Sequence, residues 1–600
     1  MTELFEPVDV FDHRVAEADG SALTAYNEAG VLTAGDLQIA RRIAAICEEL
    51  DQDAVLALAL TVRAVRDGSV CLDLERVPDL APDLPVPGAA AWRVALASSQ
   101  VVAAGAVVLD EGLVYLDRYH RLELAVCADL GDRERRTPPT VDETALGAAL
   151  DRAFPPAGSA GAGTRDYAEQ RRAAEQAARS WTTVLTGGPG TGKTTTVAGL
   201  ICVLADQAKD GRRLSVALAA PTGKAAARLQ ESVLEEARDA RFSDDDRRRL
   251  RDMDAVTLHR LLGWRPDNAT RFRHDRGNRL KYDLIVVDES SMVELTMMAR
   301  LLEATRPDCR LVLVGDPYQL TSVGAGAVLG DLVRGYESRT PSPVVTLETS
   351  HRFGDEIGAL AKAVREDRVD EVLERLRSGV PGIEFVEDTE PERLLRDLVL
   401  ASAREVRAAS ERGDTDAALA ALDRHRLLCA HREGPYGVTH WNRAAEAWLA
   451  EESGSDHWPT WYAGRPLIVT SNDYAVGVYN GETGVVVRRD DGALRARISG
   501  SDGVRDLATT RLVDVDTMHA LTIHKSQGSQ VDEVTVLLPP PDSRLLSREL
   551  FYTAITRARR VVRVVGSEET VRAAVRRRVQ RASGLAARLA HEAENETPLS

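Results

Sequence analysis

Short apolar segments dominate the middle of this 600-residue sequence, and each ends in glycine or polar residues before a helical pattern begins. They read TTVLTGG, SVALAAPTG, DLIVVDES, RLVLVGDP and PVVTLE. Fully apolar strands that alternate with helices indicate a parallel sheet covered on both faces. Ligands bind such sheets at the carboxyl ends of the strands, which is where the polar residues fall. We therefore expect an α/β fold with a ligand site at that edge.

A second series of the same kind, RLLCAHREG, VTVLLPP and RVVRVVGS, predicts a second parallel-sheet unit. Turn signals NDY, YNGETG and RRDDGA separate alternating strands between its members and predict a small SH3-like β-barrel inserted at 465–515. The Pro/Gly/Ala-rich tract FPPAGSAGAGT is typical of a linker. We expect a mostly helical N-terminal domain over 1–155 and two parallel-sheet α/β domains over 156–345 and 346–600.

Composition restricts the class of protein only mildly. The sequence has no run of about 18 apolar residues and no basic-then-apolar leader, so we expect a cytoplasmic protein with no membrane segment. Six widely spaced cysteines without a C-x-x-C pair favour free thiols over disulfides or a metal site. The net charge of −17 argues weakly against a nucleic-acid partner, since a basic groove can lie inside an acidic protein.

The strongest local signal is the stretch LTGGPGTGKT, which contains G-x-x-x-x-G-K-T between a strand and a helix. Its glycines let backbone N–H groups surround phosphates, Lys193 reaches the β and γ oxygens, and Thr194 is a candidate Mg²⁺ ligand. We therefore expect ATP and Mg²⁺ as cofactors. The expected nucleotide-binding residues are Gly187, Gly188, Pro189, Gly190, Thr191, Gly192, Lys193, Thr194 and Thr195.

Polar residues after two later strands predict hydrolysis. Asp288 is a candidate metal ligand, and the adjacent Glu289 is a candidate base for the attacking water. Gln319, in LVGDPYQL, is a candidate γ-phosphate sensor, although a surface amide in a turn has the same local sequence. A base that activates water favours hydrolysis over phosphate transfer to a metabolite.

Two arginines and one glutamine are weaker candidates for the same site. Arg352 in ETSHRFG and Arg557 in FYTAITRAR could each supply positive charge to the transition state from a facing domain. For any single arginine in so arginine-rich a chain, a surface position is the competing interpretation. Gln170 in AEQRRAAEQA could pair with an adenine edge, but a solvated helix glutamine is equally common.

Nine segments, in their order along the chain, resemble the superfamily 1 helicase motifs. Four stretches are similar in sequence to the RecD group: APTGKAAARL, GRPLIVTSNDY, YNGETGVV and IHKSQGS. This resemblance implies that the two α/β domains are RecA-like P-loop NTPase domains. It also implies ATP-driven movement along single-stranded DNA in the 5′ to 3′ direction. It also implies action on double-stranded DNA ends within a heterotrimer that contains RecB-like and RecC-like subunits. The residues that match its DNA-contacting motifs are Thr222, Lys224, His259, Thr522, His524, Lys525, Ser526 and Gln527.

Three points qualify the resemblance. Gln530 stands where the family usually has an acidic residue, which puts in doubt a contact with the nucleotide sugar or a facing arginine. The segments GSVCLDL and GLVYLDRYHRLELAVCADL resemble the amino-terminal domain through which RecD docks on RecC. A stand-alone RecD-like helicase and a regulatory subunit whose ATP site acts as a switch remain as alternatives.

Overall fold

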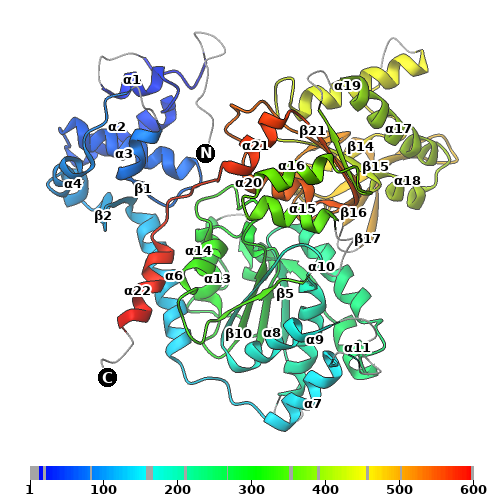
Figure 1. Cartoon of the computed structure of the whole chain (residues 1–600), viewed down its shortest axis with the longest axis horizontal. Helices are drawn as coiled ribbons and strands as arrows, with labels where there is room; N and C mark the ends of the chain where they lie inside the picture. Colours follow the sequence, from blue (N-terminus) through cyan, green and yellow to red (C-terminus); the bar gives the residue numbers. More distant parts are fainter. Residues whose placement is uncertain are drawn as a thin grey trace.

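The computed structural model describes residues 12–17, 22–80, 84–156, 158, 166–208, 212–265, 268–349, 356–387, 392–454, 459–473, 475–500 and 503–595. Two α/β units lie against each other, and a helical unit lies to one side of them (Figure 1). This arrangement, with the two sheets described next, confirms the predicted fold class of two parallel-sheet domains and a mostly helical N-terminal region.

The first α/β unit is built on a six-stranded sheet in which every pairing is parallel. In spatial order its strands are β11 (Val344–Leu347), β4 (Thr182–Gly187), β10 (Arg310–Gly315), β9 (Leu284–Val287), β5 (Val216–Ala220) and β6 (Ala255–Thr257). Because successive strand residues point to opposite faces, Leu185 packs on one layer of helices and Val184 on the other. Both faces of the sheet are therefore buried.

Helices from distant parts of the chain form those two layers. One layer contains α7 (Glu143–Ala153), α8 (Ala168–Arg179), α9 (Lys193–Asp206), α10 (Gly223–Glu236) and α11 (Asp244–Arg251). The other contains α12 (Leu258–Leu262), α13 (Leu295–Ala304), α14 (Val328–Gly335), α6 (Asp117–Arg135) and α22 (Leu585–Asn595). In Figure 1, α22 at the carboxyl end lies beside α6.

The second α/β unit has a five-stranded parallel sheet in the order β12 (Ile383–Val386), β21 (Ala558–Val565), β20 (Val531–Leu537), β13 (His425–Cys429) and β19 (Ala520–Thr522). One face packs on α15 (Glu356–Arg365), α16 (Val369–Arg377), α20 (Arg548–Ile555) and α21 (Glu568–Arg576). The other packs on α17 (Glu392–Glu411) and α19 (Val438–Ser453). The helix α18 (Thr415–Leu422) packs against α17.

The segment between β13 and β19 carries a five-stranded antiparallel sheet with its own small apolar core. Its order is β17 (Gly503–Ala508), β16 (Leu494–Gly500), β15 (Thr483–Arg488), β14 (Pro466–Val469) and β18 (Val515–Thr517). The recorded pairings among the described residues do not join β17 to β18. The insert is therefore present as an antiparallel sheet, and its closure into an SH3-like barrel stays a prediction.

The N-terminal unit has a separate hydrophobic core. At its centre is α3 (Gln52–Arg66), in which the eleven consecutive residues from Ala54 to Ala64 are buried. A helix buried all round must be covered by other elements. These are α1 (Ala22–Glu28), α2 (Ala34–Cys47), α4 (Ala89–Ala97), α5 (Gln100–Ala103), β1 (Leu72–Asp73), β2 (Val107–Asp110) and β3 (Leu113–Leu116).

The predicted boundary near residue 155 does not coincide with a change of packing partner. Both α6 and α7 come before it in sequence, yet both pack on the first parallel sheet. We propose that the N-terminal unit ends near Leu116 and that the first α/β unit includes α6, α7 and α22.

Two expectations about the chain as a whole concern its cysteines and membrane segments. All six cysteines lie in the described part of the chain and outside any disulfide, and all but Cys47 are buried. Among the helices that the structure describes, none has the length and apolar character needed to cross a membrane.

Arg133 attaches α6 to the first sheet. Its guanidinium is buried and donates hydrogen bonds to the Thr182 hydroxyl (2.8 Å) and to the carbonyl oxygens of Trp181 (2.6 Å), Arg306 (3.0 Å) and Cys309 (2.6 Å). These acceptors lie at the amino ends of β4 and β10 or just before them. One side chain thus joins α6 to acceptors at two neighbouring strands. The carbonyl oxygens of Trp181 and Arg306 also accept backbone N–H groups, those of Leu311 (2.8 Å) and Cys309 (3.1 Å).

We predict that Arg133→Ala lowers the free energy of unfolding by about 3 kcal/mol, because it removes four hydrogen bonds from a charged donor, including those to the Thr182 hydroxyl and the Cys309 carbonyl oxygen. The measurement is urea denaturation followed by circular dichroism. The control is Arg135→Ala on the same helix, which removes a half-exposed ion pair with Asp132 and should cost less than about 1 kcal/mol. Equal urea midpoints for the two variants would show that Arg133 does not anchor α6.

Candidate nucleotide site in the interdomain cleft

The phosphate-binding loop joins β4, which ends at Gly187, to α9, which begins at Lys193. Gly190 and Gly192 have φ angles of 79° and 87°, a region that favours glycine. A Cβ atom at Gly187 would lie 2.9 Å from the carbonyl oxygen of Leu347. The sequence therefore needs glycine here for steric reasons, and the result is a tight loop at the N-terminus of a 14-residue helix.

Lys193 lies over this loop, and its ammonium donates to the carbonyl oxygens of Gly187 (2.6 Å) and Gly188 (2.9 Å). Burial lowers the pKa of Lys193, while the nearby carboxylates of Asp316, Glu289 and Asp288 act in the opposite direction. The predicted phosphate-binding lysine and both predicted acids are thus close enough to interact. A triphosphate in the loop would offer Lys193 anionic oxygens in place of two backbone carbonyls.

Asp288 and Glu289 follow β9 at the carboxyl edge of the sheet. Burial, followed by the charge of Glu289, raises the pKa of Asp288 to about 6. Glu289 adopts a left-handed backbone with φ 50° and ψ 40°, which is strained for a residue with a Cβ atom. Such strain concentrates at functional sites, where the surrounding fold holds a side chain in place.

Gln319 and Asp316 follow β10, the next strand in the sheet. Both are buried, and the Gln319 amide nitrogen donates to Asp316 Oδ2 (3.1 Å). The same oxygen accepts a hydrogen bond from the Tyr552 hydroxyl (2.9 Å), which comes from α20 of the second domain. The sensor candidate therefore lies where the two domains meet.

Arg557 lies just after α20 and is buried, with 3% of its surface exposed. Its guanidinium donates to carbonyl oxygens of its own domain, those of Thr553 (3.1 Å) and Ser529 (3.2 Å). Burial lowers its pKa, and the charges of Glu289 and Asp316 oppose this shift. The structure thus brings this arginine of the second domain within electrostatic range of the acids of the first.

Arg352 lies outside the described residues. The chain just before it is held by Glu169 on α8, which accepts hydrogen bonds from the backbone N–H groups of Glu348 (2.9 Å) and Thr349 (3.2 Å). Glu169 is adjacent to Gln170, so the segment that leads to Arg352 begins beside the nucleotide site.

Gln170 contacts the backbone of the phosphate-binding loop. It is buried, and its amide nitrogen donates to the carbonyl oxygen of Thr191 (3.1 Å). The contact with adenine stays a prediction.

In the first turn of α9, the Thr195 hydroxyl donates to Glu236 (2.6 Å) on α10, whereas Thr194 is half-buried at the mouth of the loop.

The candidate DNA contacts fall at the start of two helices and in one loop. Thr222 is the N-cap of α10, where its hydroxyl accepts from the N–H of Ala225 (3.2 Å). Lys224 follows it, and burial, followed by the charge of Arg426, lowers its pKa to about 7. His259 is exposed on α12 beside the ring of Phe272.

The remaining candidates follow β19. Thr522 is half-buried and accepts from the N–H of Lys525 (3.3 Å), whose side chain is exposed. His524 is half-buried, and Ser526 is buried, with its hydroxyl on the carbonyl oxygen of Ile523 (2.6 Å). The Gln527 amide instead donates to the Leu320 carbonyl oxygen (2.6 Å), across the domain boundary.

Gln530 contacts an arginine of the facing domain, one of the two contacts that depend on an acidic residue in the family. Its Oε1 accepts a hydrogen bond of 2.6 Å from the guanidinium of Arg228, which lies on α10 of the first domain. The facing arginine is therefore present, and an amide oxygen takes the place of the usual carboxylate.

Sequence reasoning missed several residues of this cleft. The local sequence patterns assign no role to Asp316, Arg228, Tyr552 or Thr553. Tyr552 and Thr553 lie in FYTAITRAR, where only the charged Arg557 gave a chemical signal. Their importance appears only when the second domain is placed against the first.

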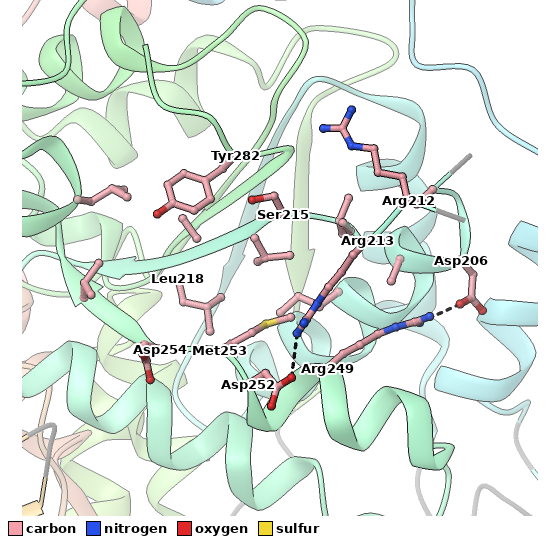
Figure 2. Close-up of a pocket in the computed structure, with 18 of the residues that line it drawn as sticks. Asp206, Arg212, Arg213, Ser215, Leu218, Arg249, Asp252, Met253, Asp254 and Tyr282 are labelled. Atoms are coloured by element: carbon pink, nitrogen blue, oxygen red, sulfur yellow. Dashed lines mark hydrogen bonds and ion pairs between the residues drawn. The ribbon is translucent and has the colours of Figure 1, made fainter. Parts of the chain in front are cut away.

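An open cavity of about 970 Å³ lies elsewhere, beside β5 and the end of α11, and it is not lined by any of the predicted site residues. Its labelled arginines already have acidic partners (Figure 2): Arg213 pairs with Asp252 (3.0 Å) and Arg249 with Asp206 (3.2 Å). Size alone therefore does not make this cavity the site of the chemistry.

Comparison with protein families places three models on the chain. Residues 28–115 match the N-terminal domain of RecBCD enzyme subunit RecD, residues 170–325 an AAA domain, and residues 517–565 a UvrD-like helicase C-terminal domain. The first match coincides with the separate N-terminal core. The other two cover the phosphate-binding loop and the segment with Gln527 and Arg557.

Among individual proteins, the chain is 55% identical over 580 residues to RecBCD enzyme subunit RecD of Mycobacterium tuberculosis, which covers 96% of this chain and 97% of that protein. The RecD subunit of Mycolicibacterium smegmatis is 54% identical, over 95% of this chain and 99% of its own. The ATP-dependent RecD2 DNA helicase of Deinococcus radiodurans is 30% identical, over 78% of this chain and 57% of its own.

More than half of the residues are shared with two RecD subunits over nearly the full length, and the match to the RecD N-terminal domain precedes two parallel-sheet units, the first of which carries the P-loop. This chain belongs to the RecD family.

Proposed function

We propose that this chain is the ATP-dependent DNA helicase subunit of a RecBCD-type complex, which processes DNA double-strand breaks for recombinational repair. One observation carries the proposal: at the strand edge that holds Lys193 and Glu289, the Tyr552 hydroxyl of the second domain donates to Asp316 of the first (2.9 Å), and Arg557 is buried just after the same helix. A nucleotide at this junction touches both domains, so its cleavage is tied to their relative movement. Membership of the RecD family supports DNA as the substrate and the cytoplasm as the location.

In the proposed reaction, the loop's N–H groups and Lys193 hold the triphosphate. Glu289 accepts a proton from a water molecule whose oxygen bonds to the γ-phosphorus, while the bond from that phosphorus to the β–γ bridging oxygen breaks. Arg557 leaves its backbone carbonyl partners and stabilises the charge that develops on the γ-phosphoryl oxygens. The products are ADP and phosphate.

Thr194 and Asp288 are the residues that would hold Mg²⁺. Both offer oxygen ligands, and P-loop sites use few protein ligands because phosphates and water complete the coordination. The raised pKa of Asp288 reflects burial beside Glu289, a repulsion that a divalent cation would relieve. When bound, the ion neutralises phosphate charge during cleavage.

For the DNA strand, we propose a path over the start of α10 and the loop after β19, which face each other across the domain boundary. Ala225 lies close to Gly528, since a Cβ atom at Gly528 would be 3.3 Å from the Ala225 Cβ. The path thus includes Thr222 and Lys224 from one domain and Thr522, His524, Lys525 and Ser526 from the other. The 5′ to 3′ direction is the one expected of RecD-like helicases.

Two alternatives differ in their partners and in their use of ATP. A stand-alone helicase is disfavoured because identity to the RecD subunits is 55%, against 30% to the RecD2 helicase. A regulatory switch is disfavoured because ATP binding alone requires neither Glu289 nor Arg557. Purification from native extract separates the first alternative from the proposal, since only a complex co-elutes with RecB-like and RecC-like subunits.

We predict that Lys193→Ala abolishes DNA-stimulated ATP hydrolysis by the full-length chain, because a phosphate contact is lost from a surface loop. Glu289→Gln should keep ATP affinity within a few-fold and trap the nucleotide uncleaved. The control is Lys281→Ala, an exposed lysine just before β9 at the opposite edge of the same sheet. Normal turnover in Lys193→Ala, or collapsed ATP affinity in Glu289→Gln, would contradict the assigned roles.

A second prediction follows from the lowered pKa of Lys224. Above pH 7 the free side chain is largely neutral, whereas a DNA phosphate favours the ammonium form, so DNA binding takes up a proton. Affinity for single-stranded DNA should therefore fall between pH 7 and 9, by up to about tenfold per pH unit. Fluorescence anisotropy at constant ionic strength measures this dependence.

The matched variant is Lys224→Arg, which stays charged over this range and should show a much flatter dependence. If the wild type and Lys224→Arg lose affinity in parallel, Lys224 is not the titrating contact.

A further inference from the structure

The Tyr552 hydroxyl lies at the point where the second domain meets the phosphate-binding loop. The side chain is buried, with 2% of its surface exposed, and its hydroxyl donates to Asp316 Oδ2 at 2.9 Å. A Cβ atom placed on Gly188 would lie 3.3 Å from the same hydroxyl. Tyr552 therefore touches the loop and an acid of the first domain at once.

Asp316 also binds Gln319 and so links it to Tyr552. An ionised carboxylate only accepts hydrogen bonds, so the Gln319 amide must turn its nitrogen toward Asp316 Oδ2 (3.1 Å). The Gln319 oxygen then points the other way. Gln319 is 4% exposed, and its Oε1 has no hydrogen-bond partner within the part of the chain that the structure describes.

Leaving a buried amide oxygen unpaired destabilises the fold, so we expect this oxygen to gain a hydrogen-bond donor when the substrate binds. A donor that could fill this position is the water that attacks the γ-phosphorus.

The backbone after Gln319 is also held by the second domain. The N–H of Leu320 donates to the Thr553 hydroxyl at 2.8 Å, and its carbonyl oxygen accepts from the Gln527 amide at 2.6 Å. With the contact from Tyr552, three side chains of the second domain fix the segment from Asp316 to Leu320. Opening the cleft would break all three contacts and release Gln319.

We infer that Tyr552 is a positioning residue for ATP hydrolysis: through Asp316 it orients the Gln319 amide so that Oε1 accepts a hydrogen bond from the attacking water only when the domains are closed. The inference rests on the proposed function. Gln319 itself forms no covalent bond, and the water's proton still passes to Glu289 as the γ-phosphorus leaves the bridging oxygen.

The test is Tyr552→Phe in the full-length chain with saturating single-stranded DNA. Loss of one hydrogen bond to a charged acceptor should lower kcat for ATP roughly tenfold to hundredfold, while KM stays within about twofold. A second variant, Asp316→Asn, should lower kcat in the same way, because its amide no longer dictates which end of Gln319 faces it. Unchanged kcat in Tyr552→Phe, or a raised KM at normal kcat, overturns the inference.

A double-mutant cycle separates positioning from a merely structural role. In a Gln319→Ala background, Tyr552→Phe should cost less than about twofold more in kcat, because the residue that it positions is already gone. Additive losses would overturn the inference. The control is Tyr26→Phe, which removes another 2.9 Å hydroxyl bond, to the Pro85 carbonyl oxygen in the N-terminal unit, and should leave turnover normal.

Failure of the proposed function gives a different result from failure of the inference. If the wild-type chain shows no DNA-stimulated hydrolysis, the proposed function fails. If the wild type is stimulated and Tyr552→Phe matches it, only the inference fails.

Discussion

The proposed site depends on one interface, where side chains of the second α/β domain bind the segment after β10 of the first. Tyr552, Thr553 and Gln527 bind Asp316 and Leu320 with distances between 2.6 and 2.9 Å. Each of these groups is buried, so each bond forms where water cannot replace it. Gln319, the candidate nucleotide sensor, lies between the two anchored positions. The position of Gln319 therefore depends on both domains.

The same domain boundary joins the proposed nucleotide site to the proposed DNA path. Gln527 ends the TIHKSQ segment proposed to contact DNA, yet its amide binds the backbone beside Gln319. Nearby, Arg228 of the first domain binds Gln530 of the second at 2.6 Å. A DNA strand that displaces the TIHKSQ loop would therefore disturb the interdomain contacts beside the nucleotide site. This contact gives DNA-stimulated hydrolysis a structural route that requires no rearrangement of either sheet.

The N-terminal unit is attached to the first domain, partly through the carboxyl end of the chain. The Val70 N–H donates to the carbonyl oxygen of Ala582 (2.8 Å), and the Arg581 guanidinium donates to the carbonyl oxygen of Gly324 (2.9 Å). Helix α22 then packs on α6 and α14. The chain thus returns from the second domain to tie the N-terminal unit to the first. A partner bound to that unit would be held against the first domain.

The sequence was sufficient to predict the parts of this molecule that depend on local patterns. Apolar strands followed by glycine or acids predicted the parallel sheets and placed Lys193, Asp288 and Glu289 at one edge. The roles of Tyr552 and Gln527 were not predictable, because a tyrosine in a helix and an amide in a loop have no local signal for a partner more than 200 residues away. The packing of α6 and α22 on the first sheet was missed for the same reason.

The most direct test of the account is the turnover of Arg557→Ala against that of Arg559→Ala. Arg557 is buried beside the acids of the facing domain, whereas Arg559 is about half exposed and 3.8 Å from Asp532. If ATP is cleaved between the two domains, Arg557→Ala should bind ATP normally and lose about 10³-fold in DNA-stimulated hydrolysis, and Arg559→Ala should stay near wild type. Near-normal hydrolysis by Arg557→Ala would contradict a site shared by both domains.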